Sequence, residues 1–506
     1  MKVINIMNFV RQIDERMEDS ENILFNTTKE ELELVNEFGF ENTFLVQYDV
    51  LCDSRYIKLF NEQATEKTEL GLWYEIVKPL ADACGIKYES EFNWKWDWHV
   101  KPGFSMSYSP SEREKLIDEA MRKFKEVFGY YPKTVASWLI DTHTIKYLTD
   151  HYDIDAIAIC RDQTNTDAYT LIGGYFNQGY YPSINNIFTP AQSEEYQINV
   201  PVFRLLGPCP IHNYDTHKYL SEEAKKRFDN GCFTMETVWP LGKDPECVKW
   251  YFKTYYDNEN LGFSYMQIGQ ENSFGVRNFL PTLRMQLEKV KELNEDVKVI
   301  KMGVTGAFFK KLFPTTTPAT SLVALDNWDQ DSDCQSVYYN CKNYTANLFR
   351  YENSIFIRSL YLFDEKVKEK YLHEKCLTFD AVYQNLPIVD TLFSSIDEKK
   401  TCGIQICNEA KYFDAVKVSD GVLKVFWDQG EVIFFEDEIS IKSKEINFYL
   451  GKSISNYSLT ENGVLIEFNG KKYILEVLGA SLHLENNVIS FKDIAEKCIF
   501  RFKSLL

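Results

Sequence analysis

Apolar runs that end in a charged residue recur through the first three hundred residues of the chain. The clearest run, 135–140, stops at Asp141, and a helical pattern follows it. A second apolar run, 154–160, is followed directly by Arg161 and Asp162. A strand, a helix and a second strand form a βα unit, and in α/β barrels the carboxyl ends of such strands point into the active-site mouth. The pattern places Asp141 and Asp162 at a candidate site; the alternative is that Asp141 only caps the following helix.

The same alternation of strand and helix extends across this part of the chain. Apolar runs predict further strands at 3–7, 43–48, 200–206, 263–268 and 297–302, with a short element at 69–76. Two pairs with the spacing of a capping box, Thr28 with Glu31 and Ser111 with Glu114, predict two helices, each closed by a glycine. Repeated strand–helix order predicts a parallel sheet or barrel over residues 1–320.

The pattern changes after about residue 320. Short β-rich runs now dominate, and turn pairs such as Asn462-Gly463 and Asn469-Gly470 separate them. The stretch LIEFNGKKYILEV is typical of a hairpin with an Asn-Gly turn. We therefore predict a C-terminal all-β sandwich over residues 321–506.

Composition and charge narrow the function. The chain has 506 residues, a formal net charge of −19 and 15% aromatic residues. Nucleic acid requires a basic footprint, so this charge argues against it and against anionic membrane surfaces. A neutral substrate fits better, and abundant aromatic rings suit stacking on sugars. The apolar run at the start is too short for a signal peptide, and no apolar run is long enough for a membrane-spanning helix. The 12 cysteines are dispersed, without a C-x-x-C motif. We therefore expect a reduced cytoplasmic protein.

Four acidic residues follow predicted strands: Asp49, Asp141, Asp162 and Glu271. Glycoside hydrolysis needs two carboxyl groups beside the scissile bond, one as proton donor and one as nucleophile or base. We assign Asp141 as the nucleophile or base and Glu271 as the acid, with Asp49 and Asp162 as the next pair to consider. Each of these acids could instead be part of a salt-bridged scaffold.

A tryptophan-rich loop, FNWKWDWHVKPGFSMSY, places Trp96, Trp98, Asp97 and His99 close together. Alternating tryptophans suggest a stacking platform with polar tips, although the loop could also bury its own rings against the barrel. His143, two residues after Asp141, could join Asp141 and His99 in a metal site, but a histidine in such a loop is more often a hydrogen-bonding partner.

The order of these motifs resembles a known superfamily. A strand ending at Asp49, then ELGLW, FGYYP, SWLID and ICRD, is similar to the glycoside hydrolase/deacetylase superfamily of irregular (β/α)7 barrels. SWLID resembles the family-38 α-mannosidase motif, whose nucleophilic aspartate corresponds to Asp141, and that family's barrel is followed by β domains. The chain departs from the deacetylases, because Asn8-Phe9 stands where they carry an acidic pair and their metal histidines would fall near Trp73 and Val77.

The sequence hypothesis is a carbohydrate-active hydrolase of the α/β class, an irregular (β/α)7-type barrel followed by a β sandwich. We expect a glycoside hydrolase that acts on neutral glycans without a metal or another cofactor, and oligomeric state is not indicated. The alternatives are a metal-dependent carbohydrate deacetylase and a non-catalytic glycan-binding barrel. Besides the catalytic pair, the residues expected to bind substrate are Asn8, Arg11, Asp49, Glu75, Trp96, Asp97, His99, Trp138, His143, Arg161 and Asp162.

Overall fold

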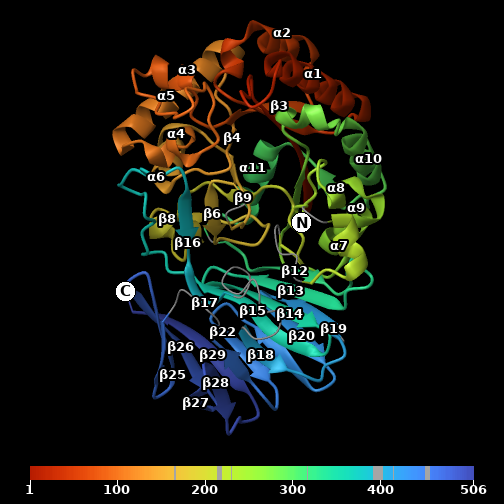
Figure 1. Cartoon of the computed structure of the whole chain (residues 1–506), viewed down its shortest axis with the longest axis vertical. Coiled ribbons are helices and arrows are strands. Elements are labelled where there is room, and N and C mark those ends of the chain that lie inside the picture. Colours follow the sequence, from red (N-terminus) through yellow and green to blue (C-terminus); the bar gives the residue numbers. More distant parts are fainter. Residues whose placement is uncertain are drawn as a thin grey trace.

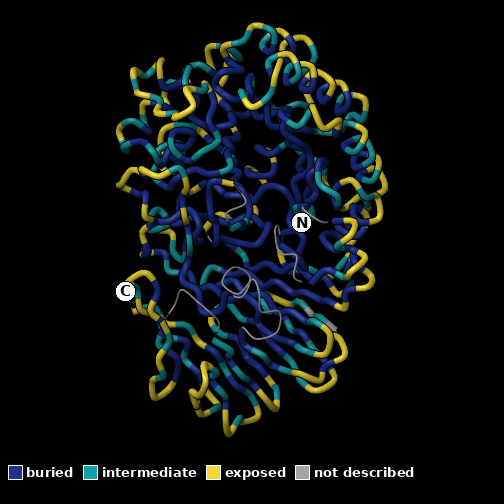
Figure 2. The backbone as a smooth tube through the Cα atoms, viewed as in Figure 1, coloured by how far each residue is buried: buried dark blue, intermediate teal, exposed yellow. Residues whose placement is uncertain are grey.

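The computed structural model describes residues 1–164, 167–213, 219–228, 231–315, 317–390, 403–413, 415–450 and 456–505. An N-terminal barrel surrounded by helices stacks on a C-terminal block of β-sheets (Figure 1). Buried residues are concentrated in the barrel strands and between the C-terminal sheets, and exposed residues lie mainly along the outer helices and the hairpin tips (Figure 2).

Seven parallel strands build the barrel in the order β10-β1-β2-β3-β4-β5-β9. No ladder joins β9 to β10 within the described strands, so the barrel is incomplete there. A further strand, β11, pairs with the first half of β1. The predicted irregular α/β barrel is confirmed. The strands are β1 (Lys2–Val10), β2 (Asn42–Val46), β3 (Thr68–Trp73), β4 (Thr134–Ala136), β5 (Ala156–Ile159), β9 (Val202–Arg204), β10 (Ser264–Ile268) and β11 (Val297–Val299).

Helices cover the outside of the barrel (Figure 1). They are α1 (Ser20–Phe38), α2 (Ser54–Gln63), α3 (Lys78–Ala83), α4 (Val100–Gly103), α5 (Pro110–Phe128), α6 (Thr142–His151), α7 (Glu222–Phe228), α8 (Pro240–Lys243), α9 (Pro245–Phe252), α10 (Leu280–Lys291) and α11 (Met302–Leu312). Short turns of 3-10 helix are η1 (Val50–Cys52), η2 (Ser105–Ser107), η3 (Glu194–Tyr196) and η5 (Asn272–Arg277), and η4 (Lys253–Asp257) is a π-helix.

Both capping-box predictions were misplaced. Helix α5 opens with a reciprocal box between Ser109 and Glu112, two residues before the predicted pair. Helix α1 begins at Ser20, so Thr28 lies inside it and its hydroxyl donates to the carbonyl of Leu24. A Ser/Thr-x-x-Glu spacing also occurs inside helices, where the hydroxyl bonds backward along the same helix, so spacing alone does not identify a helix start.

The C-terminal domain is a sandwich of two antiparallel sheets, as predicted. One sheet runs β12-β13-β14-β15-β18-β23-β28-β27, with β17 beside β15, and the other runs β19-β20-β21-β22-β29-β26-β25-β24. Side chains from both sheets share one hydrophobic core, and the Asn469-Gly470 turn joins β25 to β26 with both residues at positive φ. The strands are β12 (Thr320–Ala324), β13 (Cys334–Asn340), β14 (Tyr344–Tyr351), β15 (Ser354–Leu362), β17 (Leu386–Asp390), β18 (Gly403–Cys407), β19 (Ala415–Ser419), β20 (Val422–Trp427), β21 (Gly430–Phe434), β22 (Glu438–Lys442), β23 (Asn447–Tyr449), β24 (Asn456–Thr460), β25 (Gly463–Phe468), β26 (Lys471–Leu478), β27 (Ser481–Glu485), β28 (Val488–Lys492) and β29 (Cys498–Ser504).

One segment of the sandwich returns to the barrel, and we name residues 364–385 the strap. Its strand β16 (Ala381–Gln384) pairs in parallel with β6 (Tyr169–Ile172), and beside them the chain forms a small hairpin of β7 (Pro182–Ser183) and β8 (Asn186–Pro190). Strap backbone carbonyls also accept hydrogen bonds from Arg113 of α5. The strap therefore covers one flank of the barrel around α5 and α6.

Among the described helices, none is both long enough and apolar enough to cross a membrane.

Candidate active site

A cavity of about 490 Å³ opens at the carboxyl ends of the barrel strands. Residues one to three positions after β1, β3, β5, β9 and β10 contribute to its wall. The wall combines five carboxyl groups with four tryptophans, namely Asp14, Glu75, Asp167, Glu236 and Glu271 with Trp96, Trp98, Trp138 and Trp239. Polar groups that converge among aromatic rings are typical of a small-molecule site.

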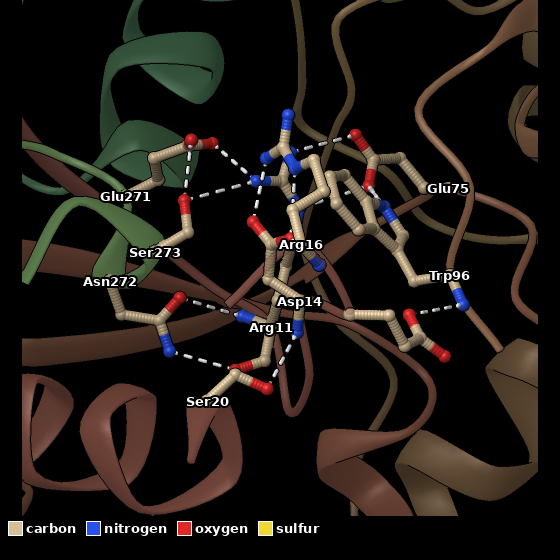
Figure 3. Close-up of polar contacts among 10 residues, drawn as sticks. Arg11, Asp14, Arg16, Ser20, Glu75, Trp96, Glu271, Asn272 and Ser273 are labelled. Carbon is tan, nitrogen blue, oxygen red and sulfur yellow. Dashed lines mark hydrogen bonds and ion pairs between the residues drawn. The ribbon is translucent and has the colours of Figure 1, made fainter. Parts of the chain in front are cut away.

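Arg11, directly after β1, is the centre of the polar network in this cavity (Figure 3). Its Nε and one terminal nitrogen donate to the two carboxylate oxygens of Glu75, at 3.2 and 3.1 Å. The other terminal nitrogen donates to Glu271 Oε2 at 2.6 Å. Burial by itself lowers the pKa of Arg11, but the charges of Glu271 and Glu75 outweigh it and the pKa is raised. Arg11 is therefore a buried cation held between two carboxylates.

Trp96 closes this network from the tryptophan-rich loop. Its indole nitrogen donates to Glu75 at 2.7 Å, and its ring lies under the guanidinium of Arg11, 4.4 Å from the ring centroid. Arg16 stacks at 4.9 Å on the same ring and forms a bidentate ion pair with Asp14 (Figure 3). The loop thus presents Trp96 as a fixed part of the wall, since cation–π contacts and a buried hydrogen bond hold it.

The position of the Glu271 carboxylate is fixed by residues near it in the chain as well as by Arg11. It stands three residues after β10 at the start of η5, and Ser273 donates to its Oε1 at 2.6 Å. Asn272 fixes this turn to the first strand end, because its side-chain oxygen accepts from the Arg11 backbone N–H and its amide donates to the Arg11 carbonyl. A carboxylate has about four lone-pair directions, so two accepted bonds leave Glu271 able to act on a substrate.

Glu236 is one of three carboxyl groups of the cavity that the sequence analysis missed, together with Asp14 and Asp167. Its side chain is buried, and its Oε2 makes no hydrogen bond to any described residue. Burial raises its pKa to about 8; the charges of Glu271 and Asp167 add to this rise, and that of Arg161 opposes it. Glu236 is therefore protonated at neutral pH. The available signal was an acid inside the apolar stretch FTMETVW, which predicts a buried carboxyl group.

Asp141 does not line the cavity, which corrects its assignment as nucleophile or base. It caps α6 by accepting from the backbone and hydroxyl of Thr144, and Ser105 donates to it at 2.6 Å. Arg113 completes a fully buried ion pair with it at 2.8 Å. The predicted strand over 135–140 ends at Ala136, so the chain turns away before it reaches Asp141. The capping alternative describes the residue correctly.

Of the residues predicted to bind or act on substrate, five line the cavity: Arg11, Glu75, Trp96, Trp138 and Glu271. The remaining predicted binding residues stand outside its wall, and most have structural partners. The Asn8 side-chain oxygen accepts from the Gln270 backbone, and Asp162 accepts from Arg204 at 2.8 Å. Arg161 lies behind the wall, where it donates to Gln163 at 2.8 Å.

Four more predicted binding residues lie outside the wall. Asp97 accepts from Ser90 and lies 2.7 Å from the Nδ1 of His99, so the two residues stabilise their own loop. His143 lies 3.1 Å from Glu114 on α5. Asp49 caps η1, and burial raises its pKa to about 7. Bonds within the tryptophan-rich loop hold Asp97 and His99, whereas Asp49 is a helix cap and His143 belongs to α6.

The superfamily resemblance implies a metal, but the residues present do not fit one. The corresponding positions on β1 and β3 hold Phe9 and Trp73, whose ring centroids are 4.5 Å apart. Trp138 packs edge-on against both rings. This aromatic cluster offers no ligand atoms for a hard or borderline metal. Over the described part of the chain, no three His, Cys, Asp or Glu side chains gather in a way that could hold a metal ion.

Comparison with solved structures agrees with this architecture. A protein from Parabacteroides distasonis, named "putative glycoside hydrolase/deacetylase", matches with a TM-score of 0.54 at 13% identity, over 79% of this chain and 94% of its own. The chain has the glycoside hydrolase/deacetylase fold. A "putative polysaccharide deacetylase" from Mycobacterium smegmatis matches at a TM-score of 0.37 and 13% identity, over 62% of this chain and 91% of its own.

Sequence comparison adds a family without an assigned function. The family model Domain of Unknown Function with solved-structure structure (DUF3863) matches residues 72–321. This range runs from β3 to the start of β12 and contains Glu75, Glu236 and Glu271. No curated protein matches the chain.

Proposed function

We propose that this protein is a glycoside hydrolase that cleaves a glycan by a two-carboxylate mechanism, with Glu236 as proton donor and Glu271 as nucleophile or base. The observation that carries the proposal is one cavity in which these two glutamates lie among four tryptophans. The fold belongs to carbohydrate-active enzymes, and the aromatic cluster in place of metal ligands favours hydrolysis without a metal.

The two glutamates differ in the way that glycoside hydrolysis requires. Glu236 keeps its proton at neutral pH, because burial raises its pKa to about 8. Glu271 forms an ion pair with Arg11. A buried acid that keeps its proton suits the role of proton donor, and a carboxylate ion-paired with an arginine suits the role of nucleophile or base.

The tryptophans supply the remaining requirement, which is to hold a sugar ring beside the two acids. Trp96 and Trp98 come from one loop, Trp138 follows β4, and Trp239 lies three residues beyond Glu236. Flat apolar faces with one polar edge bind the apolar face of a sugar while polar groups bind its hydroxyls. We therefore expect binding to be distributed around the cavity wall.

Turnover of a panel of aryl glycosides and natural oligosaccharides tests the proposal. Glu236→Gln should retain activity on aryl glycosides with good leaving groups and lose it on natural glycosides, since only the latter need protonation of the leaving oxygen. Glu271→Gln should lose activity on both. Glu288→Gln, an exposed change on α10 outside the cavity, is the matched control and should behave like wild type.

The outcomes separate the alternatives. Wild-type activity in both cavity variants would refute the acid pair. Glycan-dependent thermal stabilisation without turnover on any substrate would identify a non-catalytic glycan-binding barrel instead. Release of acetate from acetylated sugars that depends on added metal would favour the deacetylase.

A further inference from the structure

Arg277, the last residue of η5, lines the same cavity as the two catalytic glutamates. Its guanidinium lies over two aromatic rings, 5.3 Å from the centroid of Trp239 and 4.8 Å from that of Phe274. Cation–π stacking uses the faces of a guanidinium and leaves its in-plane N–H donors available. The rings thus orient Arg277 without using its hydrogen-bonding capacity.

Those donors have no partner within the part of the chain that the structure describes. Every other arginine forms an ion pair or donates a hydrogen bond, whereas Arg277 does neither. The chain has 75 acidic residues against 56 basic ones, so acidic partners are plentiful. Arg277 is an exposed residue of the cavity wall, so its donors face solvent and remain available to a ligand.

The other cations of the cavity are neutralised. Arg11 is paired with Glu75 and Glu271, and Arg16 is paired with Asp14. Arg277 is thus the arginine of this wall whose charge is left for a ligand. Its planar guanidinium presents two parallel N–H donors, which match the paired oxygens of a carboxylate or a similar oxyanion.

We infer that Arg277 forms a subsite for an anionic substituent of the glycan, either a uronate carboxylate or a sulfate ester. The inference rests on the proposed function and specifies its substrate class. It also revises the expectation of a neutral substrate, which came from the net charge of the whole chain. Charge inside the cavity decides recognition at contact distance, because salt screens the more distant surface charges.

The position of Arg277 makes it a specificity residue. Arg277 stands six positions after Glu271, and at about 2.0 Å of rise per residue a 3-10 helix places their α-carbons roughly 12 Å apart along its axis. We place the anionic group on a sugar beside the one whose bond is cleaved. We expect Arg277 to affect binding of acidic glycans much more than binding of neutral ones.

Binding to a glycan array tests this without requiring turnover. The array pairs uronate-bearing and sulfated oligosaccharides with neutral ones of the same length, and it is probed with full-length wild type, Arg277→Gln, Arg277→Lys and Arg284→Gln. Arg284 is the control, because it is an arginine of the neighbouring α10 that pairs with Glu37 outside the cavity. Titration calorimetry then gives affinities for the glycans that bind.

We expect at least one acidic glycan to bind wild type and Arg284→Gln about tenfold or more tightly than Arg277→Gln, with neutral glycans affected much less. Arg277→Lys should recover part of the affinity, since lysine keeps the positive charge but lacks the two parallel N–H donors of the guanidinium. Binding of uronates or of sulfated sugars shows which anion is the ligand. The inference is overturned if no acidic glycan distinguishes wild type from Arg277→Gln. Selective acidic binding without hydrolysis of any glycoside would retain the subsite and refute the hydrolase.

Discussion

Glu271 and Asp141 both follow strands of the same barrel, and each forms an ion pair with an arginine, at 2.6 and 2.8 Å. Glu271 lines the cavity, whereas Asp141 is completely enclosed. Arg11, the partner of Glu271, also lines the cavity, and the partner of Asp141, Arg113, is as deeply buried as Asp141. Two acids that look equivalent along the sequence thus have different surroundings.

The strap accounts for much of this difference. On the Asp141 side, its Glu369 accepts from the backbone and hydroxyl of Thr142, and its carbonyls accept from Arg113. At β10 the wall is built from η5 and the loop after β1. An acid at a strand end is therefore available for chemistry only where no other segment covers it and takes up its hydrogen-bonding capacity.

The largest expected effect is on stability, through Asp141→Asn. The amide is nearly isosteric, but it leaves Arg113 buried without a counter-charge, which typically costs about 3–5 kcal/mol. Urea unfolding followed by tryptophan fluorescence measures the loss, and Asp150→Asn at the exposed face of α6 is the control. Folded Asp141→Asn protein should keep wild-type turnover. Loss of turnover with unchanged stability would contradict the comparison and restore Asp141 as a catalytic residue.

Glu271→Gln should give the opposite result. Arg11 keeps its bidentate contact with Glu75, so the loss of stability should be smaller than for Asp141→Asn. Activity should fall at least about 100-fold, because an amide cannot serve as nucleophile or base. Thermal unfolding and steady-state rates on one glycoside, measured side by side for both variants, give the comparison. Equal losses of stability would show that the two ion pairs are alike after all.

Much of this architecture could be predicted from the sequence. Regular strand–helix alternation and an Asn-Gly hairpin identified the barrel and the sandwich, because both signals are local. Arg11 and Glu75 were also found, since each follows a strand that ends in the cavity.

The rest depends on contacts between distant segments. Nothing near Asp141 in the sequence shows that residues 371 and 374 of the strap will accept hydrogen bonds from its arginine partner. Glu236 was missed for a similar reason: it follows no regular strand of the barrel, and it enters the cavity through a connection after β9. Local pattern predicts elements, and it does not predict which strand ends another segment will cover.

A moderate effect is expected on the pH dependence of activity. Glu236 must carry its proton to act as the acid, and its pKa of about 8 implies that kcat/KM falls as pH rises through that value. The basic limb should disappear in Glu236→Gln when a substrate with a good leaving group is used, because that substrate needs no proton donor. A basic limb that persists unchanged in the variant would assign the titration to another group.

The smallest expected effect concerns the strap. Burial raises the pKa of Glu369 to about 7, the nearby charge of Asp141 adds to the rise, and hydrogen bonds from Thr142 oppose it. A carboxyl whose pKa is raised by folding contributes stability that is fully present below its usual value near 4.5 and is lost as pH rises through about 7. The melting temperature should therefore drop by a few degrees between pH 5 and 8 as Glu369 ionises beside Asp141.

Glu369→Gln isolates this contribution, since it cannot ionise and still offers one oxygen to Thr142. It mimics the protonated carboxyl, so stability at pH 5 should stay close to that of wild type, and the decline toward pH 8 should flatten. Glu374→Gln, an exposed change on the same strap, should keep the wild-type slope. The melting temperature is measured across this pH range, and turnover of a glycoside is measured in parallel. If the melting temperature varies less with pH in Glu369→Gln and activity is unchanged, the region around Asp141 titrates independently of the cavity that contains Glu271. An unchanged slope would mean that Glu369 does not control how the strap is held, and that the Asp141 side is sealed by Arg113 alone.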